Sequence, residues 1–499
     1  MNFVTKPIYI YSIYIILALI LFSVVLTGNF VFDDTIFVQT NQHIRSLTNF
    51  FTFFETSPIT GAGLDGSNFY RPLETLIYAL IYVIFGLSPF VFHLIPILLH
   101  TVNSLLVRGI LSKFEFSPLS AFIGGILFLT HPAQLEAVSY ISGLADPLAL
   151  FFFLLGLFAI LKQSWWALLW LTLSLLSKEW AVLFLPIYLL VTLYQWPKLS
   201  EAAKQFRRLC LVPTTLLISI YLVLKFTILN FTGEVGLAST VPHIGIRLIT
   251  FVSIIWEYVK ILFFPLHLYI ERPYTYFYSI LTPQFIFGIT LIFTVIFGII
   301  YFYKKDRRIS LGLLWICIAI IPYTNIIPMN AIYLEHWLYL PMIGFTILFA
   351  YIINQIHNKK ILLGILIGIG IIFITRGIVR NLDWANTERF YLHELSYQET
   401  ARIHNNLAMY YAESERYEDA IAHYSRSLSI NDSFPQTYHN LAQTYRAMGK
   451  YKEAEQMYLN ALTLNPNFMH SYVGLYYLYT EIGNKDKAQE MLNILNTEQ

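Results

Sequence analysis

The chain has 499 residues, of which 57% are hydrophobic and 12% are charged, whereas about 25% of residues are charged in soluble domains. This composition predicts a polytopic membrane protein. The formal net charge of +2 is too small to attract nucleic acid, so no nucleic-acid partner is expected. Cys210 and Cys317 lie in apolar runs and are too few for a disulfide framework or a zinc site.

Thirteen apolar segments precede residue 380. The first, within residues 1–27, is too long for a typical signal-peptide core and lacks a small-x-small cleavage site. It is therefore expected to be an uncleaved span with a cytoplasmic N-terminus. The other segments lie near 73–87, 90–112, 119–130, 147–162, 165–176, 180–195, 208–230, 248–266, 284–303, 309–327, 338–355 and 361–376.

Three basic groups predict cytoplasmic loops, because Lys and Arg are enriched on the cytoplasmic side. They are Lys198 with Lys204, Arg207 and Arg208; Lys304 with Lys305, Arg307 and Arg308; and Lys359 with Lys360. The number of crossings between two such loops is even, so the segments 73–87 and 248–266 are expected to lie flat at the interface. Eleven spans then remain, and the C-terminus lies on the non-cytoplasmic side.

A repeat follows Arg376. Its period is 34 residues, which is the tetratricopeptide signature. The equivalent positions are Asn406, Asn440 and Gly474; Leu407, Leu441 and Leu475; Tyr411, Tyr445 and Tyr479; and Ala420, Ala454 and Ala488. The sequence thus predicts an all-α protein, with a helical membrane domain at 1–380 and a short tetratricopeptide-repeat α-solenoid at 381–499 on the non-cytoplasmic side. Such repeats bind an extended peptide or a partner protein, or serve as a structural cap.

The predicted topology puts most remaining charges of the membrane domain on the non-cytoplasmic side. Among them, Asp33 and Asp34 are either a solvated end of the first span or a catalytic pair. The catalytic interpretation is possible because burial beside a membrane cavity raises the pKa of a carboxylate toward that of a general base. Lys178 and Glu179 interrupt two apolar runs, and such charges indicate function because burying them is costly.

Further polar residues stand at the mouths of other spans. Glu335 and His336 repeat the pattern of Lys178 and Glu179, and Asp146 opens another span. Arg71 is either a snorkelling anchor or a functional cation. His131 and Glu136 are five residues apart and do not match the HExxH spacing of a zinc site.

Several short motifs, in one order, carry a family resemblance. They are Phe32-Asp33-Asp34; Tyr70-Arg71-Pro72-Leu73; His131-Pro132 with Glu136-Ala137-Val138 and Gly143-Leu144-Ala145-Asp146; Ser177-Lys178-Glu179; and Leu338-Tyr339-Leu340-Pro341 with Gly344-Phe345. Together with the repeats, this set resembles the transmembrane and tetratricopeptide-repeat O-mannosyltransferases, which are GT-C glycosyltransferases related to the protein O-mannosyltransferases. The resemblance implies about eleven spans, a polyprenyl-phosphate-linked sugar donor and an essential acidic pair. Two motifs depart from the family: Leu144 replaces an Arg, and His336 replaces an Arg after Glu335.

Transfer of a sugar from a lipid phosphate to a hydroxyl requires a base, cations that hold the leaving phosphate, and a pocket that excludes water. Asp33 and Asp34 are the expected base and orienting group, in either order. The expected phosphate-binding residues are Arg71, Lys178, His336 and Arg272, and the expected supporting residues are His131, Glu136, Asp146, Glu179 and Glu335. No cofactor is required, and a divalent metal is not demanded because fixed cations neutralise a phosphate.

The sequence therefore favours an inverting glycosyltransferase that moves a sugar, expected to be mannose, from a polyprenyl phosphate to a Ser or Thr hydroxyl of a protein or peptide. Its partners are then the lipid-linked sugar, membrane lipid and the acceptor. A transferase acting on a lipid or polysaccharide, and a membrane-anchored tetratricopeptide scaffold without activity, are the alternatives. The short repeat array favours a bacterial plasma membrane over the endoplasmic reticulum.

Overall fold

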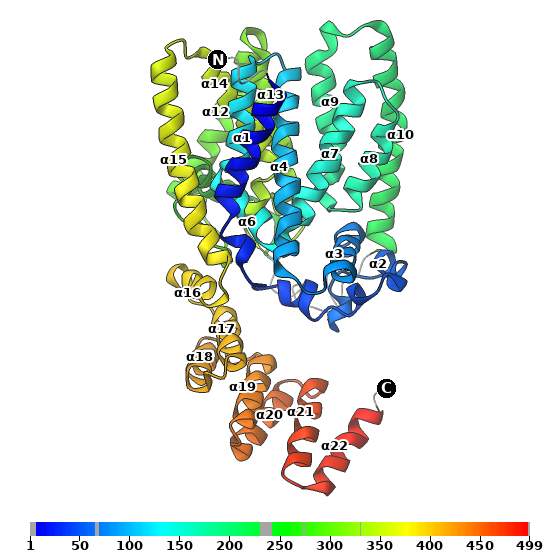
Figure 1. The fold of residues 1–499 in the computed structure, drawn as a ribbon, viewed down its shortest axis with the longest axis vertical. Coiled ribbons are helices and arrows are strands. Elements are labelled where there is room, and N and C mark those ends of the chain that lie inside the picture. Colours follow the sequence, from blue (N-terminus) through cyan, green and yellow to red (C-terminus); the bar gives the residue numbers. More distant parts are fainter. Residues whose placement is uncertain (1–5, 65–68, 230–241, 273–274, 330, 498–499) are drawn as a thin grey trace. The chain divides into compact units, whose positions relative to one another are not determined.

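The computed structural model describes residues 6–64, 69–229, 242–272, 275–329 and 331–497 (Figure 1). The secondary structure of these residues is helical, with no strand among them, so the predicted all-α fold is confirmed. The chain divides into two compact units, Met1–Asn386 and Thr387–Gln499. The predicted boundary at 380 differs from this division because the last helix of the first unit continues to Trp384.

The first unit is a bundle of long apolar helices. In Figure 1 the helices α1, α4, α10 and α15 run along the bundle, and α2 and α3 lie at one end of it. The α-helices of this unit are α1 Pro7–Phe22, α2 Thr52–Glu55, α3 Pro72–Phe85, α4 Pro89–Lys113, α5 Pro118–Thr130, α6 Leu135–Ser139, α7 Ala145–Leu161, α8 Trp166–Leu175, α9 Phe184–Gln195, α10 Glu201–Thr227, α11 Ile244–Phe263, α12 Pro283–Lys305, α13 Arg307–Ile320, α14 Pro341–Gln355 and α15 Lys359–Trp384.

Six helical stretches among the described residues are long and apolar enough to cross a membrane, and a seventh is counted if α5 and α6, bent by 53°, form one span. The six are Pro89–Lys113, Ile141–Leu161, Glu179–Lys198, Glu201–Thr227, Pro283–Lys305 and Lys360–Trp384. The helices α1, α3, α8 and α14 are apolar but shorter, with 10–17 residues each. The first unit is thus a membrane domain, while the count of eleven spans stays a prediction.

Local sequence explains where these helices begin. Proline occupies the first turn of α3, α4, α5, α12 and α14, where its fixed φ suits a helix and its missing N–H costs nothing. The α10 helix begins at Glu201 because the Ser200 side chain accepts a hydrogen bond from the N–H of Ala203. The prediction that Lys204, Arg207 and Arg208 lie in a loop was therefore wrong, since they belong to the first turns of α10. Segment 208–230 ends at Asn230, which lies outside the described residues.

Small residues allow two membrane helices to approach closely. A Cβ atom added to Gly344 on α14 would lie 2.6 Å from the backbone oxygen of Gly312 on α13. Helices in membranes associate through such small-residue contacts because lipid provides no hydrophobic force between them. The α13–α14 pair therefore depends on glycine at both positions.

The second unit begins with α16 Thr387–Tyr397 and continues as three helix pairs. The pairs are α17 Ala401–Glu413 with α18 Tyr417–Ile430, α19 Pro435–Ala447 with α20 Tyr451–Leu464, and α21 Met469–Glu481 with α22 Lys485–Thr497. The turn inside each pair contains a residue with positive φ, and these residues, Glu415, Gly449 and Gly483, again have a spacing of 34. Glycine adopts this conformation without strain, so only the first pair carries the cost of a side chain there.

Candidate active site

The loop that follows α1 holds the acidic pair. The N–H of Asn29 donates a hydrogen bond to the carbonyl oxygen of Ala385, just after α15, at 3.2 Å. Asn381 on α15 donates to the carbonyl oxygen of Leu21 at 2.7 Å and accepts from the hydroxyl of Ser139 at 2.5 Å. The end of α15 thus anchors the first loop and α6 to one another.

Asp34 is buried, with 1% of its surface exposed, and its carboxylate accepts three hydrogen bonds. Its Oδ2 accepts from the N–H of Val31 at 3.0 Å, and its Oδ1 accepts from the N–H and the hydroxyl of Ser142, at 2.9 and 2.6 Å. Ser142 belongs to η8 Ile141–Gly143, which is far along the chain. The Asp34 side chain therefore joins the first loop to η8.

Burial raises the pKa of Asp34 to about 7, although the hydrogen bonds from Ser142 and Val31 oppose this rise and the neighbouring charge of Asp33 adds to it. A carboxyl group with these contacts has little freedom to meet a substrate. Its arrangement is that of an orienting group.

Asp33 is half-buried and lies beside the phenol of Tyr140, with which it interacts electrostatically. The Tyr140 ring stacks on Trp384 with a centroid distance of 5.0 Å, and Phe32 lies on Tyr140 at 6.2 Å. Phe32 itself has φ of +59°, a conformation that non-glycine residues rarely adopt and that tends to occur at functional sites. Asp33 and Asp34 follow this turn and have different neighbours, Tyr140 and Ser142 respectively.

Arg71 stands at the start of α3, between two carboxylates. Its Nη1 lies 3.7 Å from Glu74 Oε2, and its Nε lies 3.6 Å from Glu179 Oε2. Both distances exceed that of a hydrogen bond, and the Nε atom has no hydrogen-bond partner among the described residues. Glu179 is held instead by the N–H of Tyr70, which donates to its Oε1 at 3.1 Å. Arg71 therefore keeps donor capacity that a ligand can use.

Lys178 and Asp146 form a close buried ion pair. The Lys178 Nζ lies 2.6 Å from Asp146 Oδ2, and the indole N–H of Trp180 donates to Asp146 Oδ1 at 2.9 Å. The two oxygens of Asp146 are thereby satisfied, whereas the ammonium group of Lys178 has three donors. The positive charge of Arg71 also interacts with Asp146. The predicted residues Arg71, Asp146, Lys178 and Glu179 are thus brought together.

Glu74 connects this cluster to the loop of the acidic pair. Its Oε1 accepts a hydrogen bond from the N–H of Ala145 at 3.1 Å. The hydroxyl of Tyr78 lies 3.2 Å from the same Oε1 and 2.7 Å from the carbonyl oxygen of Ile141, one residue before Ser142. The η8 turn therefore contacts both the acidic pair and the Arg71 cluster.

A second cluster joins η12 Glu335–Leu338 to α6. The Nδ1 of His336 lies 2.8 Å from Glu136 Oε1, and the N–H of His336 donates to Glu136 Oε2 at 2.9 Å. Arg272 Nη2 donates to Glu335 Oε1 at 2.7 Å, and its side chain is 3% exposed. The side chains of His336 and Arg272 each face a carboxylate at hydrogen-bond distance, unlike that of Arg71.

His131 lies apart from the acidic groups. Its Nε2 is 2.9 Å from the carbonyl oxygen of Leu262, and its Nδ1 accepts from the N–H of Ala133. Its ring packs edge-on against Phe373 at 4.7 Å. In the described part of the chain, no three His, Cys, Asp or Glu side chains are arranged to hold a metal ion. The His131 ring thus links the backbone of α11 to that of η7, Pro132–Gln134, and its predicted role in support of the site stays a prediction.

The sequence analysis did not include Glu74 or Ser142 in the site. Glu74 follows Arg71 by three residues in a predicted apolar segment, and this spacing was a usable signal for an ion pair. Ser142 carries no such signal, because its partner Asp34 is 108 residues away.

The fold and these clusters define an all-α membrane protein with buried charges between its helices and a helical repeat unit at its C-terminal end. Residues 399–467 match the family model for the tetratricopeptide repeat, which confirms the predicted repeats.

Comparison with known proteins confirms the predicted family resemblance. Protein O-mannosyl-transferase F38B6.6 of Caenorhabditis elegans is 27% identical over 442 residues, which cover 85% of this chain and 63% of that protein. Protein O-mannosyl-transferase TMTC3 of Mus musculus is 24% identical over 452 residues, covering 80% of this chain and 49% of the relative. Protein O-mannosyl-transferase tmtc2 of Xenopus laevis is 32% identical over 201 residues, or 37% of this chain and 24% of the relative. The chain spans less than two thirds of the length of these relatives.

Proposed function

We propose that this chain is an integral membrane glycosyltransferase. It moves a sugar, which we propose to be mannose, from a polyprenyl phosphate to a Ser or Thr hydroxyl of a protein. The observation that carries the proposal is that the two aspartates of the acidic pair have different surroundings. Asp34 accepts three hydrogen bonds in a buried position, and the adjacent Asp33 is left half-buried beside Tyr140. The similarity to proteins named protein O-mannosyl-transferase supports the same reaction.

In this mechanism Asp33 is the general base. It takes the proton of the acceptor hydroxyl while the hydroxyl oxygen forms a bond to the anomeric carbon of the sugar. The bond between that carbon and the phosphate oxygen breaks, and the polyprenyl phosphate leaves with the electron pair. Attack opposite the leaving group inverts the anomeric centre. Asp34 holds the loop so that Asp33 points at the acceptor.

The leaving phosphate is stabilised by fixed cations. Arg71 is the best-suited cation, because its guanidinium is not hydrogen-bonded to the carboxylates beside it and binds phosphate oxygens in a fork. Lys178 assists with the ammonium donors that Asp146 does not use. His336 and Arg272 face Glu136 and Glu335 directly, so in this proposal they stabilise the site rather than bind the phosphate. No metal ion or other cofactor takes part in the proposed steps.

The proposed location is a bacterial plasma membrane, with the site and the repeat unit on the non-cytoplasmic side. Protease digestion of sealed vesicles tests the side, since a repeat unit protected in right-side-out vesicles contradicts it. In the proposal the repeats recruit the acceptor protein.

The test of the reaction uses purified protein, labelled polyprenyl-phosphate mannose and a Ser/Thr peptide. Wild-type protein is expected to label the peptide, and Asp33→Asn is expected to reduce the rate at least ~100-fold, as loss of a general base does. Asp34→Asn reduces both the rate and the stability. Equal transfer by Asp33→Asn and wild type refutes the assignment, and label that appears only in a lipid or polysaccharide product selects that acceptor class instead.

A further inference from the structure

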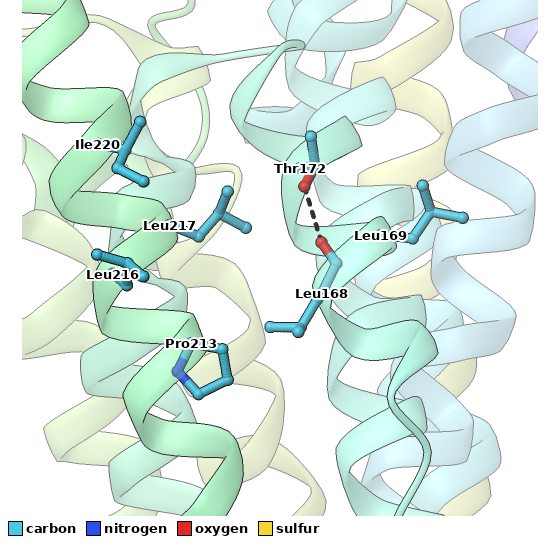
Figure 2. Close-up of a pocket in the computed structure, with 7 residues that line it drawn as sticks. All are labelled: Leu168, Leu169, Thr172, Pro213, Leu216, Leu217 and Ile220. Carbon is cyan, nitrogen blue, oxygen red and sulfur yellow. Dashed lines mark hydrogen bonds between the residues drawn. The ribbon is translucent and has the colours of Figure 1, made fainter.

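An apolar groove of about 310 Å³ lies between α8 and α10, at the lower end of the usual range for ligand pockets, about 300–1,000 Å³ (Figure 2). Its lining residues are Leu168, Leu169 and Thr172 on α8, and Pro213, Leu216, Leu217 and Ile220 on α10. The hydroxyl of Thr172 donates to the carbonyl oxygen of Leu168 at 2.9 Å, as drawn in Figure 2, so it does not make the groove polar. Leu169 and Leu216 are 42% and 59% exposed, so one side of the groove is open. The groove suits a hydrocarbon chain.

Both walls of the groove run in the same direction. In Figure 2, α8 runs upward from Leu168 to Thr172, and α10 runs upward from Pro213 to Ile220. The two helices therefore approach the same end of the groove. Beyond this end α8 stops at Leu175 and the chain reaches Lys178, while α10 continues to Lys225. The groove therefore leads toward a lysine along each wall.

The α10 side chains form a continuous row from the groove to its lysine. Leu217, Tyr221 and Lys225 are spaced by four residues and share one face of the helix. Lys225 lies about 7 Å along the axis beyond Ile220, since an α-helix rises about 1.5 Å per residue. Tyr221 is 7% exposed, and its hydroxyl has no hydrogen-bond partner among the described residues. A polar ligand at this position would satisfy it.

Three cations meet at this end of the groove. Lys225 is 9% exposed and interacts electrostatically with Glu179 and Arg71. The segment of Arg71 is tied to the end of α8, because the N–H of Leu73 donates to the carbonyl oxygen of Leu176 at 3.2 Å. Lys178 follows Leu176 by two residues. Arg71 thus interacts with Lys225 of α10 and with Asp146, the ion-pair partner of Lys178.

Three carboxylates, those of Glu74, Asp146 and Glu179, accompany the three cations, so the formal charges cancel. The cluster nevertheless keeps hydrogen-bond donors that an added phosphate can use. The guanidinium nitrogens of Arg71 lie 3.7 Å from Glu74 Oε2 and 3.6 Å from Glu179 Oε2, beyond hydrogen-bond distance. The ammonium group of Lys178 has three donors, of which one is hydrogen-bonded to Asp146. An apolar chain that ends in a phosphate matches a groove that ends in these donors.

We infer that the α8–α10 groove holds the isoprenoid chain of the sugar donor, with its phosphate at Arg71, Lys178 and Lys225. The identity of the occupant rests on the proposed function. Lys225 then becomes a phosphate-binding residue of a helix that the sequence analysis treated as a plain span. The occupant is a polyprenyl phosphate rather than a bilayer phospholipid, because the proposed reaction uses that donor. The sugar attached to the phosphate extends toward Asp33.

The test measures photocrosslinking of full-length protein by a radiolabelled polyprenyl phosphate that carries no sugar and has a photoreactive group in its first isoprene units. Leu217→Trp fills the groove and is expected to reduce labelling at least tenfold. Val212→Trp is the matched control, because Val212 lies on the same helix, is 72% exposed and does not line the groove. Labelling of this control is expected to stay within twofold of wild type.

A second variant separates binding of the phosphate from binding of the chain. Lys225→Met is expected to weaken retention of polyprenyl phosphate at least tenfold, while retention of the uncharged polyprenol changes less than twofold. Equal retention of the phosphate by this variant and wild type overturns the role of Lys225. The variant also keeps the inference testable if Leu217→Trp fails to fold.

Three results overturn the groove itself: label mapped to peptides outside α8 and α10, equal labelling of Leu217→Trp and wild type, and competition by phosphatidylglycerol as strong as by unlabelled polyprenyl phosphate. The sugar-transfer assay is run in parallel on the same preparation. Transfer by wild type with the label elsewhere refutes the groove and leaves the proposed function standing. Label in α8 and α10 without any transfer supports the groove and refutes the proposed function.

Discussion

Substitution of Ser142 by Ala removes the hydroxyl that orients Asp34. The hydroxyl donates to Asp34 Oδ1 at 2.6 Å, and both residues are buried. A hydrogen bond to a charged group contributes about 1.5–3 kcal/mol. The N–H of Ser142 still donates to the same oxygen at 2.9 Å, so the carboxylate keeps a partner and we expect a loss of about 1.5 kcal/mol in the free energy of unfolding.

A double-mutant cycle with Asp34→Ala isolates this contribution. In the Asp34→Ala background the hydroxyl has lost its acceptor, so Ser142→Ala is expected to cost nothing further, which gives a coupling of at least ~1 kcal/mol. Ser174→Ala is the matched control, because the buried Ser174 donates to the carbonyl oxygen of Ala149 at 2.8 Å and has no contact with Asp34. Its cost should be the same in both backgrounds.

The assay is unfolding of the detergent-solubilised protein by SDS, followed by tryptophan fluorescence. Equal costs of Ser142→Ala with and without Asp34 would refute the view that this bond holds the acidic pair. Transfer activity is expected to fall together with the stability, because a displaced Asp34 no longer orients Asp33.

Four further outcomes follow from the geometry. Burial raises the pKa of Asp34 to about 7 from an ordinary value of 3.8. Between about pH 4 and pH 7 the folded protein therefore keeps a proton that the unfolded chain has already released. Stability is therefore expected to fall as the pH rises through this window, and SDS unfolding at several pH values should show that Asp34→Asn removes the dependence. Arg71→Lys keeps the charge but loses the fork, so initial transfer rates should drop at least ~10-fold, and unchanged rates contradict the role in phosphate binding. Gly344→Ala would bring Cβ to 2.6 Å from the Gly312 oxygen and should lower the SDS unfolding free energy by about 1–3 kcal/mol, whereas no change would show that α13 and α14 separate freely. Glu415→Gly relieves a φ of +58° and should stabilise the repeat unit by up to ~1 kcal/mol, measured as slower limited proteolysis of that unit; faster cleavage speaks against strain at this turn.

The sequence predicted much of the fold because the relevant signals are local. Apolar runs and prolines at their starts indicate membrane helices, and the period of 34 residues indicates the repeats. Boundaries were predicted less well. The α10 helix begins at Glu201, before the apolar run, because the Ser200 cap and the polar first turns extend it. Composition alone does not report such an extension.

The sequence predicted several residues of the candidate site, but not Glu74 or Ser142 and not the contacts between its residues. Asp33, Asp34, Arg71 and Lys178 were recognised because charges beside apolar runs are costly and therefore informative. Which aspartate is buried was open, since the answer depends on Ser142, 108 residues away. Contacts between distant segments leave no periodic trace in a single sequence.

The sequence by itself determined that this protein is helical, spans a membrane, ends in tetratricopeptide repeats and carries a set of costly intramembrane charges, because hydrophobicity, charge and a fixed repeat period are properties of neighbouring residues. Only the tertiary structure decided how those charges pair. It joins Lys178 to Asp146, sets Arg71 between Glu74 and Glu179 beyond hydrogen-bond distance, and leads an apolar groove toward Lys225. Such pairings arise from the packing of segments that are distant in the chain, and packing is a property of the whole fold.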